Sequence, residues 1–300
     1  MLLAQFIRQG TSALEPLYPE AEARSIVLML CEALIGTQSY THIVEPQYTV
    51  NPKDEEPLSQ ALKRLKAGEP IQYVIGRAQF CGRNFRVTPD VLIPRPETEL
   101  LVQEAVRLAD MTRRQRIPFG KSASPVRVLD LCTGSGCIAW SVALSVPGAQ
   151  VTGVDISEKA LEVARSQDFS RELKATGAVA PTFVQADVLD TEQAFDQGPF
   201  DLILSNPPYI MEKEKAQMRR NVLDYEPGLA LFVPDEDPLL FYRAVARWSQ
   251  RFLAPEGKGL SEINEALGKE TAEVFRHFGF PQSETESDFF DKNRFVFYTR

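Results

Sequence analysis

VRVLDLCTGSG, residues 126–136, combines an apolar run typical of a buried β-strand with a glycine-rich turn, and a helical pattern follows at once. Glycines let the backbone approach a ligand closely, and the N-terminus of the following helix offers free N–H groups and positive potential. In open α/β sheets, ligands bind at the carboxyl ends of the strands. The segment therefore predicts an α/β fold whose ligand carries a carboxylate or a phosphate near this turn.

Strands and helices alternate from residue 126 onward, which predicts a doubly wound, mainly parallel sheet. We expect the last two strands to pair antiparallel, because only a short connection around Phe289 to Asn293 separates them. The expected strands cover residues 126–131, 150–155, 182–187, 200–205, 257–263, 282–288 and 294–299. The expected helices cover residues 135–146, 157–175, 236–252 and 268–279.

The chain before residue 126 has a different organisation. Apolar residues at helical spacing predict an amphipathic helix near the start, a second helix from about Pro19 to Gly36, and a third from about Pro57 to Ala67. Residues 71–88 alternate and contain two glycines, which predicts a β-hairpin.

A helix is expected to open at Pro96, and residues 111–125 are expected to form an exposed connection. We therefore predict a helical domain over residues 1–68, a β-hairpin connector over residues 69–95, and an α/β domain over residues 96–300.

Composition excludes several classes of protein. The 300 residues carry a net charge of −8, which argues against a broad phosphate-binding surface. Four cysteines without a C-x-x-C pair and only two histidines predict no metal site, and reduced thiols favour a cytoplasmic location. The N-terminus lacks the pattern of a signal peptide, and no run of about 18 apolar residues predicts a membrane span.

Acidic residues stand at the ends of three expected strands. Asp155 ends the second strand, where an acidic residue accepts hydrogen bonds from a ribose. Asp187, with Val188 after it, follows the third strand, where a carboxylate can accept from an adenine amino group; capping of the next turn explains this Asp nearly as well. Asp130 lies within the first strand, where Asp is disfavoured, and is suited to orienting the glycine turn or meeting an ammonium group.

Asn206-Pro207-Pro208-Tyr209 follows the largely apolar run Phe200–Ser205. Two consecutive prolines fix φ and remove two backbone donors, and a residue that precedes proline is held extended. The segment therefore presents the Asn206 side chain, the Pro207 carbonyl oxygen and the Tyr209 ring in fixed directions. Two acceptors and an aromatic face suit a planar group that carries –NH₂, such as a carboxamide or a base amine, although a rigid turn without chemistry is the alternative.

These features fall at the carboxyl ends of four successive strands, and together they describe a pocket for an adenosine with a charged tail. S-adenosylmethionine fits this description, with its carboxylate at the helix N-terminus and its ribose at Asp155. The predicted cofactor-binding residues are Asp130, Cys132, Thr133, Gly134, Ser135, Gly136, Asp155, Asp187, Val188 and Asn206. The predicted substrate-binding residues are Asn206, Pro207, Pro208 and Tyr209, of which Asn206, Pro207 and Tyr209 are the predicted catalytic residues.

Four stretches carry a resemblance to a known family, and they are spread over nearly the whole chain. The first runs from Gly68–Tyr73 through to Ile93–Glu99. The second is Asp130–Gly136, the third is Ser205–Tyr209, and the fourth is Glu226-Pro227 with the nearby Ala230-Leu231. On these residues the chain resembles the peptide chain release factor glutamine methyltransferases, the HemK/PrmC family of class I S-adenosylmethionine-dependent methyltransferases. The run Ile-Pro-Arg-Pro-Glu-Thr-Glu at 93–99 is the most discriminating, because general adenine methyltransferases with Asn-Pro-Pro-Tyr lack it.

The resemblance implies a seven-stranded class I methyltransferase sheet and a helical N-terminal domain that helps to recognise a class I peptide chain release factor. It also implies methyl transfer to the side-chain amide nitrogen of the glutamine in the factor's Gly-Gly-Gln motif. The chain departs from the family at Cys132, where glycine is usual, and a Cys there requires φ below zero or some strain. The roles of Arg95 and Glu97 stay open.

Three other functions compete with this interpretation. A nucleic-acid amino-methyltransferase shares the amide-holding segment but needs a target-recognition region and positive charge to hold a flipped base. A nucleotide-binding oxidoreductase accounts for the G-x-G-x-x-A pattern of Gly134–Ala139 but leaves Asn-Pro-Pro-Tyr without a task. An adaptor that binds the release factor without chemistry is the third.

Overall fold

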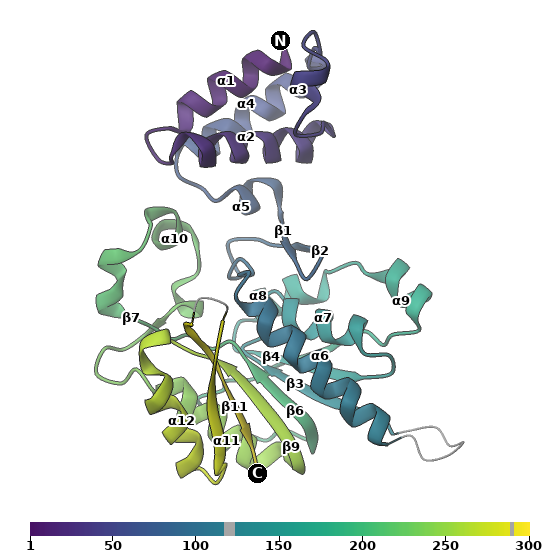
Figure 1. Ribbon diagram of the computed structural model, residues 1–300, viewed down its shortest axis with the longest axis vertical. Coiled ribbons are helices and arrows are strands. Elements are labelled where there is room, and N and C mark those ends of the chain that lie inside the picture. Colours follow the sequence, from purple (N-terminus) through teal and green to yellow (C-terminus); the bar gives the residue numbers. More distant parts are fainter. Residues whose placement is uncertain (117–123, 289–290) are drawn as a thin grey trace. The chain divides into compact units, whose positions relative to one another are not determined.

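A seven-stranded sheet forms the centre of the larger part of the chain (Figure 1), counted over residues 1–116, 124–288 and 291–300, which the computed structural model describes. Its strands lie in the order β10-β11-β9-β6-β3-β4-β5. They are β3 Arg127–Leu131, β4 Gln150–Asp155, β5 Thr182–Gln185, β6 Phe200–Ser205, β9 Leu253–Glu262, β10 Gln282–Ser287 and β11 Asn293–Thr299.

The sheet is mainly parallel, as the sequence predicts. β3 pairs in parallel with β4 and β6, β4 with β5, and β6 with β9, whereas β11 is antiparallel to both β9 and β10. The expected connection between the last two strands includes residues 289 and 290, which lie outside the described residues. Because successive strands are added on opposite sides of β3, a topological switch point lies between β3 and β6.

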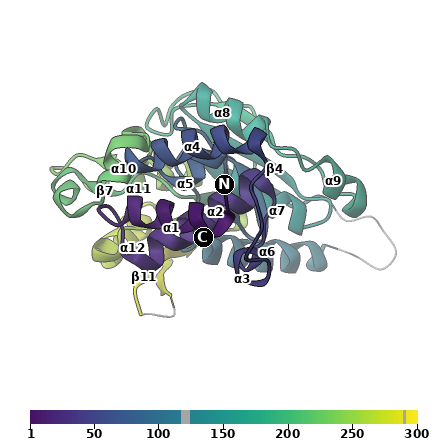
Figure 2. The same cartoon turned by 90° about the horizontal axis from the view of Figure 1, so that it is seen from above.

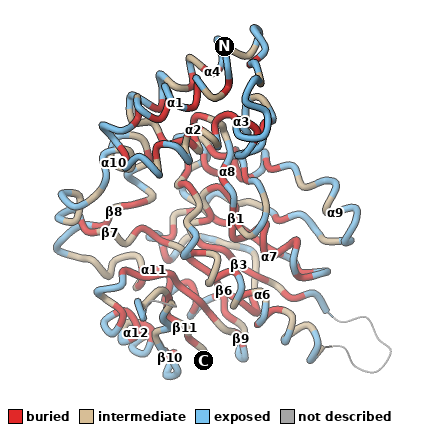
Figure 3. The backbone as a smooth tube through the Cα atoms, turned by 45° about the horizontal axis from the view of Figure 1, so that its top comes forward, coloured by how far each residue is buried: buried red, intermediate tan, exposed pale blue. Residues whose placement is uncertain are grey.

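Alternation along the central strands builds an apolar core on each face of the sheet. Val128 and Leu202 pack in one core with α6 (Thr98–Gln115) and α7 (Cys137–Ser145). Their neighbours Leu129 and Ile203 pack in the other core with α11 (Leu240–Phe252) and α12 (Gly268–His277). Figure 3 shows the central strands as buried, which is the pattern expected of a parallel sheet covered by helices on both faces.

The described chain divides into two compact units. The sheet belongs to the unit made of Ala78–Gln217 and Pro227–Arg300, and the other unit is made of Met1–Arg77 and Met218–Glu226. Short elements of the first unit are β7 Ile210–Met211, η1 Glu212–Gln217, η2 Gly228–Ala230, β8 Phe232–Val233 and η3 Glu265–Leu267, and β7 pairs with β8.

Helices make up the second unit, and α1, α2 and α4 pack side by side around a shared apolar core (Figures 1 and 2). The helices are α1 Leu3–Leu14, α2 Glu20–Ile35, α3 Thr41–Val44, α4 Pro52–Lys66, α5 Ile71–Ile75 and α10 Arg220–Tyr225. Two contacts attach the distant segment that contains α10: Arg219 pairs with Glu22 at 2.6 Å, and the Tyr225 hydroxyl donates to the Ala67 carbonyl oxygen at 2.9 Å. This segment is therefore part of the helical unit although about 140 residues separate it from α5 along the chain.

The expected start of the third helix, at Pro57, was wrong. The helix α4 begins at Pro52, since the side chain of Asn51 accepts a hydrogen bond from the Lys53 N–H at 3.1 Å and so caps the helix. Asn at the cap followed by Pro at the first helical position is a strong start signal. Pro57 lies inside the helix as a result.

Two other expectations need correction. Residues 71–75 form the helix α5, and the hairpin is confined to β1 (Arg77–Phe80) and β2 (Arg83–Arg86). The expected helix over 157–175 is two helices, α8 Glu158–Arg165 and α9 Ser170–Thr176. The break is explained by Gln167, whose buried side chain bonds the backbone of Arg86. The Asp168 carboxylate accepts from the N–H of Ser170, the first residue of the new helix.

The connection expected over residues 111–125 begins later than predicted, because α6 continues to Gln115. Residues 117–123 of that connection lie outside the described residues. Among the residues that are described, no helix has the length and apolar character needed to cross a membrane.

Gly259 on β9 provides a test of the packing between β9 and β11. A Cβ atom built at this position would lie 1.9 Å from Cζ of Tyr298, which is fully buried and hydrogen-bonded to Ser249 at 2.8 Å. Because the ring cannot move aside without breaking that bond, we expect Gly259→Ala to lower the unfolding free energy by about 1–3 kcal/mol or more. Chemical denaturation of both proteins measures the difference.

Gly228→Ala is the matched control, because its Cβ would meet Phe232 at an ordinary contact distance of 3.6 Å. Equal stability of the Gly259→Ala variant and this control would contradict the packing described here.

Candidate active site

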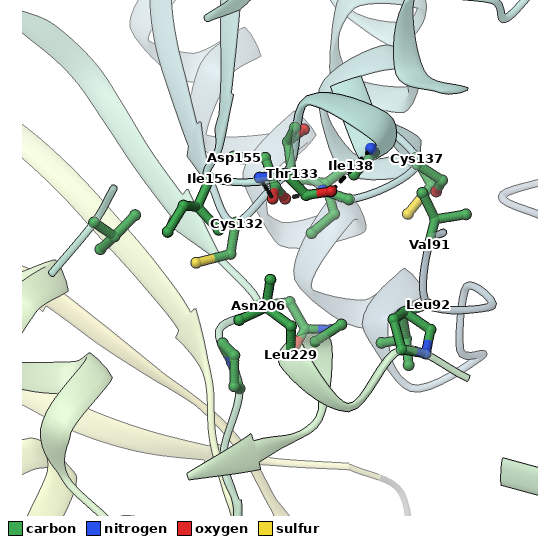
Figure 4. A pocket seen from close by; sticks show the side chains of 18 of the residues that line it. Val91, Leu92, Cys132, Thr133, Cys137, Ile138, Asp155, Ile156, Asn206 and Leu229 are labelled. Atoms are coloured by element: carbon green, nitrogen blue, oxygen red, sulfur yellow. Dashed lines mark hydrogen bonds between the residues drawn. The ribbon is translucent and has the colours of Figure 1, made fainter. Parts of the chain in front are cut away.

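A cavity lies at the carboxyl ends of the central strands, in the unit that contains the sheet (Figure 4). Cys132, Thr133 and Asp155 lie on one side of it, and Asn206 and Leu229 lie across from them. The cavity is therefore at the switch point between β3 and β6, where open α/β sheets bind their ligands.

The glycine turn lines the cavity between β3 and α7. Gly134 and Gly136 have φ values of 54° and 77°, a conformation that glycine adopts without strain. Gly136 also allows close packing, since a Cβ there would lie 3.0 Å from Cβ of Ala164 and 3.1 Å from the rings of Phe183 and Trp140. The turn thus depends on glycine for both backbone conformation and space.

Hydrogen bonds tie the turn to both neighbouring strands. The Thr133 hydroxyl donates to Asp130 Oδ2 at 2.6 Å, and the Thr133 N–H donates to the Val154 carbonyl oxygen at 2.9 Å. The Gly134 N–H donates to Asp155 Oδ2 at 2.8 Å. Asp130 does not line the cavity and instead supports the turn from behind, which is one of the two roles predicted for it.

Cys132 adopts φ of 62°, in the left-handed region that glycine prefers. Of the two conformations expected for a Cys at this position, φ below zero or a strained backbone, the structure has the strained one. The side chain lines the cavity, and burial raises the pKa of its thiol well above the ordinary value. Cys132 is therefore a neutral wall of the cavity and not a thiolate nucleophile.

Asp155 offers acceptor capacity to the cavity. Its two carboxylate oxygens accept from the Gly134 and Ser157 N–H groups at 2.8 and 2.9 Å, and these bonds fix the direction of the side chain. Each oxygen has a second lone pair, so the carboxylate can also accept from hydroxyl groups of a ligand. Burial raises the pKa of this carboxyl, whereas the backbone hydrogen bonds lower it.

Asp187 and Val188 also line the cavity, after β5. The Asp187 carboxylate accepts from the Leu189 N–H at 2.8 Å, so it caps the next turn as the alternative interpretation proposed. Its position on the wall is compatible with the binding role as well.

Asn206 and Pro208 line the cavity after β6, whereas Pro207 and Tyr209 do not reach its wall in the described residues. The Asn206 side-chain amide donates to the Thr98 hydroxyl oxygen at 3.1 Å, and the Tyr209 hydroxyl donates to Glu262 Oε1 at 3.0 Å. The predicted segment therefore has two kinds of partner: Asn206 bonds Thr98, which also lines the cavity, whereas Tyr209 bonds the buried Glu262, which is not among the described lining residues.

Sequence reasoning missed several residues of this site. The connector supplies Val91, Leu92 and Pro94 to the wall, and Glu262 ends the buried strand β9. A carboxylate at the end of a buried strand is unusual for a structural element, so Glu262 carried the same signal that singled out Asp130.

Gln167 was also missed, and it joins the hairpin to the glycine turn. Its side-chain oxygen accepts from the Arg86 N–H at 2.8 Å, and its amide donates to the Arg86 and Ser135 carbonyl oxygens at 2.9 and 3.1 Å. No pattern in the sequence pointed to it, because a glutamine between two helical segments has no distinctive signal.

The titration of Asp130 gives a test of the buried support for the turn. Burial raises the pKa of Asp130 from 3.8 to about 7, and the Thr133 hydrogen bond opposes this shift. Between these pH values folding takes up a proton, so Asp130 lowers the stability of the fold progressively as the pH rises. The D130N variant carries a neutral amide at this position and lacks this effect.

We therefore expect D130N and the wild type to have similar unfolding free energies near pH 4. As the pH rises to about 7, D130N gains relative stability by at most about 1.4 kcal/mol per pH unit, and the difference is constant above that. Denaturation curves of both proteins over this pH range measure the difference in their unfolding free energies. Other titrating groups contribute equally to both proteins and so do not affect that difference. A difference that does not change with pH would show that Asp130 is ionised throughout.

Comparison with known proteins identifies the family. The model described as "Methyltransferase domain" matches residues 122–258, and the model described as "PrmC N-terminal domain" matches residues 5–76. The fold is similar to that of the hMettl16 catalytic domain in complex with MAT2A 3'UTR hairpin 6, with a TM-score of 0.52 and 12% identity. That match covers 84% of this chain and 86% of the other, and it concerns the fold alone.

Two curated relatives match along almost their whole length. The chain is 38% identical over 294 residues to the release factor glutamine methyltransferase of Bacteroides thetaiotaomicron, covering 98% of both chains. It is 36% identical over 296 residues to that of Flavobacterium psychrophilum, covering 99% of this chain and 98% of the relative. These matches confirm the resemblance seen in the sequence, and the chain belongs to the family of release factor glutamine methyltransferases.

Proposed function

We propose that this protein methylates the side-chain amide nitrogen of the glutamine in the Gly-Gly-Gln motif of class I peptide chain release factors. S-adenosylmethionine, when bound, supplies the electrophilic methyl group. The observation that carries the proposal is the position of Asn206, which lines the same cavity as Asp155 and the glycine turn. An amide-binding side chain thus faces a site suited to an adenosine, and the names of the relatives point to the same substrate.

The chemistry of the cavity walls fits S-adenosylmethionine. The N-terminus of α7 and the glycine turn are suited to its carboxylate, and the Asp155 carboxylate is suited to the ribose hydroxyls. We assign Asp187 and Val188 to the adenine, and Asp130 to the support of the turn through Thr133. Ser135, the middle residue of the turn, also lines the cavity and is buried, so it is in reach of the same end of the cofactor.

Asn206 and Pro207 would orient the substrate. An amide nitrogen is a poor nucleophile because its lone pair is delocalised into the carbonyl group. The Asn206 side-chain oxygen and the Pro207 carbonyl oxygen would accept from the two N–H groups of the substrate amide and turn the lone pair toward the methyl group. Alignment of two bound reactants contributes up to about 7–11 kcal/mol. Pro208 would keep this segment rigid.

We assign Tyr209 to contact with the plane of the substrate amide. Its hydroxyl is held by Glu262, so the direction of the ring is fixed. The substrate nitrogen would lose its proton only after it has gained the methyl group, when it is strongly acidic. Water can then accept that proton, so the mechanism requires no strong base in the cavity.

We propose the domain boundaries 1–68, 69–95 and 96–300, with the helical part recognising the release factor. The match of the PrmC N-terminal domain to residues 5–76 supports a family-specific role for that part. Direct binding of nucleic acid or membrane is not part of the proposal. The four cysteines are free thiols and lie within the described residues, which supports a cytoplasmic location.

Replacement of Asn206 tests the proposal. We expect Asn206→Ala to lower kcat for a recombinant release factor by roughly 100-fold or more, because the oriented acceptor is lost. The dissociation constant for S-adenosylmethionine should change little, since the main cofactor contacts lie on β3, β4 and β5. Mass spectrometry of the Gly-Gly-Gln peptide measures methyl transfer, and calorimetry measures cofactor binding.

Asp155→Ala is the matched control, and it should weaken cofactor binding instead. If Asn206→Ala weakened cofactor binding and turnover to the same extent, Asn206 would belong to the cofactor site alone. Methylation of DNA or RNA without methylation of the release factor by the wild type would support a nucleic-acid methyltransferase instead.

A further inference from the structure

Two hydroxyl groups bind the carboxylate of Glu262: that of Thr98, which lines the cavity, and that of Tyr209. Glu262 is the last residue of β9 and is 4% exposed. Its Oε2 accepts from the Thr98 hydroxyl at 2.6 Å, and its Oε1 accepts from the Tyr209 hydroxyl at 3.0 Å. Thr98 in turn accepts from the Asn206 side-chain amide at 3.1 Å. A continuous chain of hydrogen bonds therefore links Glu262 to Asn206.

The donors and acceptors in this series of hydrogen bonds follow from which groups carry a proton. An ionised carboxylate only accepts hydrogen bonds, so the single hydroxyl proton of Thr98 points to Glu262. The lone pairs of the Thr98 oxygen then remain for Asn206. Only the NH₂ group of Asn206 can occupy that position, and its carbonyl oxygen must lie on the side of the amide turned away from Thr98.

We propose that Thr98 and Glu262 are positioning residues that fix the orientation of the Asn206 amide, so that its oxygen and not its NH₂ group meets the substrate. The inference rests on the proposed function, in which that oxygen accepts from the substrate amide. In the opposite orientation the NH₂ group of Asn206 would face the NH₂ group of the substrate, and two donors cannot bond each other.

The charge of Glu262 is what makes the orientation unique. A neutral amide at this position can donate to the Thr98 oxygen, which releases the Thr98 proton for the Asn206 oxygen and permits the flipped orientation. Burial raises the pKa of the Glu262 carboxyl above its ordinary value, and the hydrogen bonds from the Thr98 and Tyr209 hydroxyls oppose this shift. The orientation is therefore unique in the pH range in which Glu262 is ionised.

The start of α6 is held from two sides, which gives Thr98 a defined position. Thr98 is the first residue of α6 and is 2% exposed. The next residue, Glu99, accepts from the Cys81 N–H at 2.9 Å and so joins the helix to the hairpin. Thr98 lies in the run Ile-Pro-Arg-Pro-Glu-Thr-Glu at 93–99. That run therefore contributes a residue that positions Asn206 for the reaction.

Two variants at Thr98 separate positioning from packing. Thr98→Val keeps the shape but removes the hydroxyl, whereas Thr98→Ser keeps the hydroxyl. We expect Thr98→Val to lower kcat for the release factor roughly 10- to 100-fold, with the dissociation constant for S-adenosylmethionine and the Tm close to wild type. Thr98→Ser should restore most of kcat. Thr112→Val is the matched control on the same helix, because within the described part of the chain the Thr112 hydroxyl bonds the carbonyl oxygen of Leu108, one turn earlier, and no side chain of the site.

A double variant tests the link between Thr98 and Glu262. The comparison is made in a Tyr209→Phe background, which keeps the ring but already lacks the hydroxyl that Glu262 binds. If Thr98 and Glu262 both act through Asn206, adding Glu262→Gln to Thr98→Val should then lower kcat little further, because Thr98→Val has already broken the hydrogen-bond link to Asn206. Independent, multiplying effects of the two changes would overturn the inference. A wild-type kcat in Thr98→Val, or a Thr98→Ser variant as impaired as Thr98→Val, would overturn it as well.

An NMR measurement tests the geometry without any turnover. The side-chain NH₂ signals of Asn206, assigned by their loss in Asn206→Ala, should exchange slowly with water in the wild type and faster in Thr98→Val. Equal exchange in both proteins would refute the orientation, even if the release factor is methylated. Slow exchange in a wild-type protein that methylates no glutamine would refute the proposed function and leave the orientation standing.

Discussion

The parallel pairing of β3 with β4 on one side and β6 on the other is the constraint on which the site depends. It brings the glycine turn, Asp155 and Asn206 to one edge of the sheet, although they are far apart in the chain. Short hydrogen bonds then fix the turn to both β3 and β4, through Thr133–Asp130 and Gly134–Asp155. The cavity has a defined shape because these parts of its wall are attached directly to the ends of rigid strands.

Buried carboxylates support both halves of the site from behind. Asp130 accepts from Thr133 beneath the glycine turn, and Glu262 accepts from Thr98 and Tyr209 behind Asn206. A buried carboxylate is costly unless it receives hydrogen bonds, and in return it leaves no freedom in the direction of the hydroxyls around it. When they are ionised, the two carboxylates thus stabilise particular orientations of polar side chains, which an apolar core cannot do.

Much of the fold and part of the site followed from local patterns. Alternation and glycine turns predicted the strands of the sheet, and the strand ends pointed to Asp155, Asp187 and Asn206, all of which line the cavity. The break of the helix over 157–175 did not follow, because it depends on Gln167 binding a strand 81 residues away. Thr98 was missed for the same reason, since its partner Glu262 lies 164 residues away. Glu262 itself was missed although, like Asp130, it is a carboxylate in a buried strand.

The order of apolar, glycine and proline residues is local information, and it was enough to predict the type of fold and the family. It also predicted the stiffness of Asn206-Pro207-Pro208-Tyr209, because backbone geometry at glycine and proline depends on the residue itself. The direction of the Asn206 amide, the support of the glycine turn by Asp130 and the strained backbone of Cys132 were decided by the folded chain. Each of these depends on which donors and acceptors meet across the sheet, and that is set by strand register and helix packing between residues that are distant in sequence.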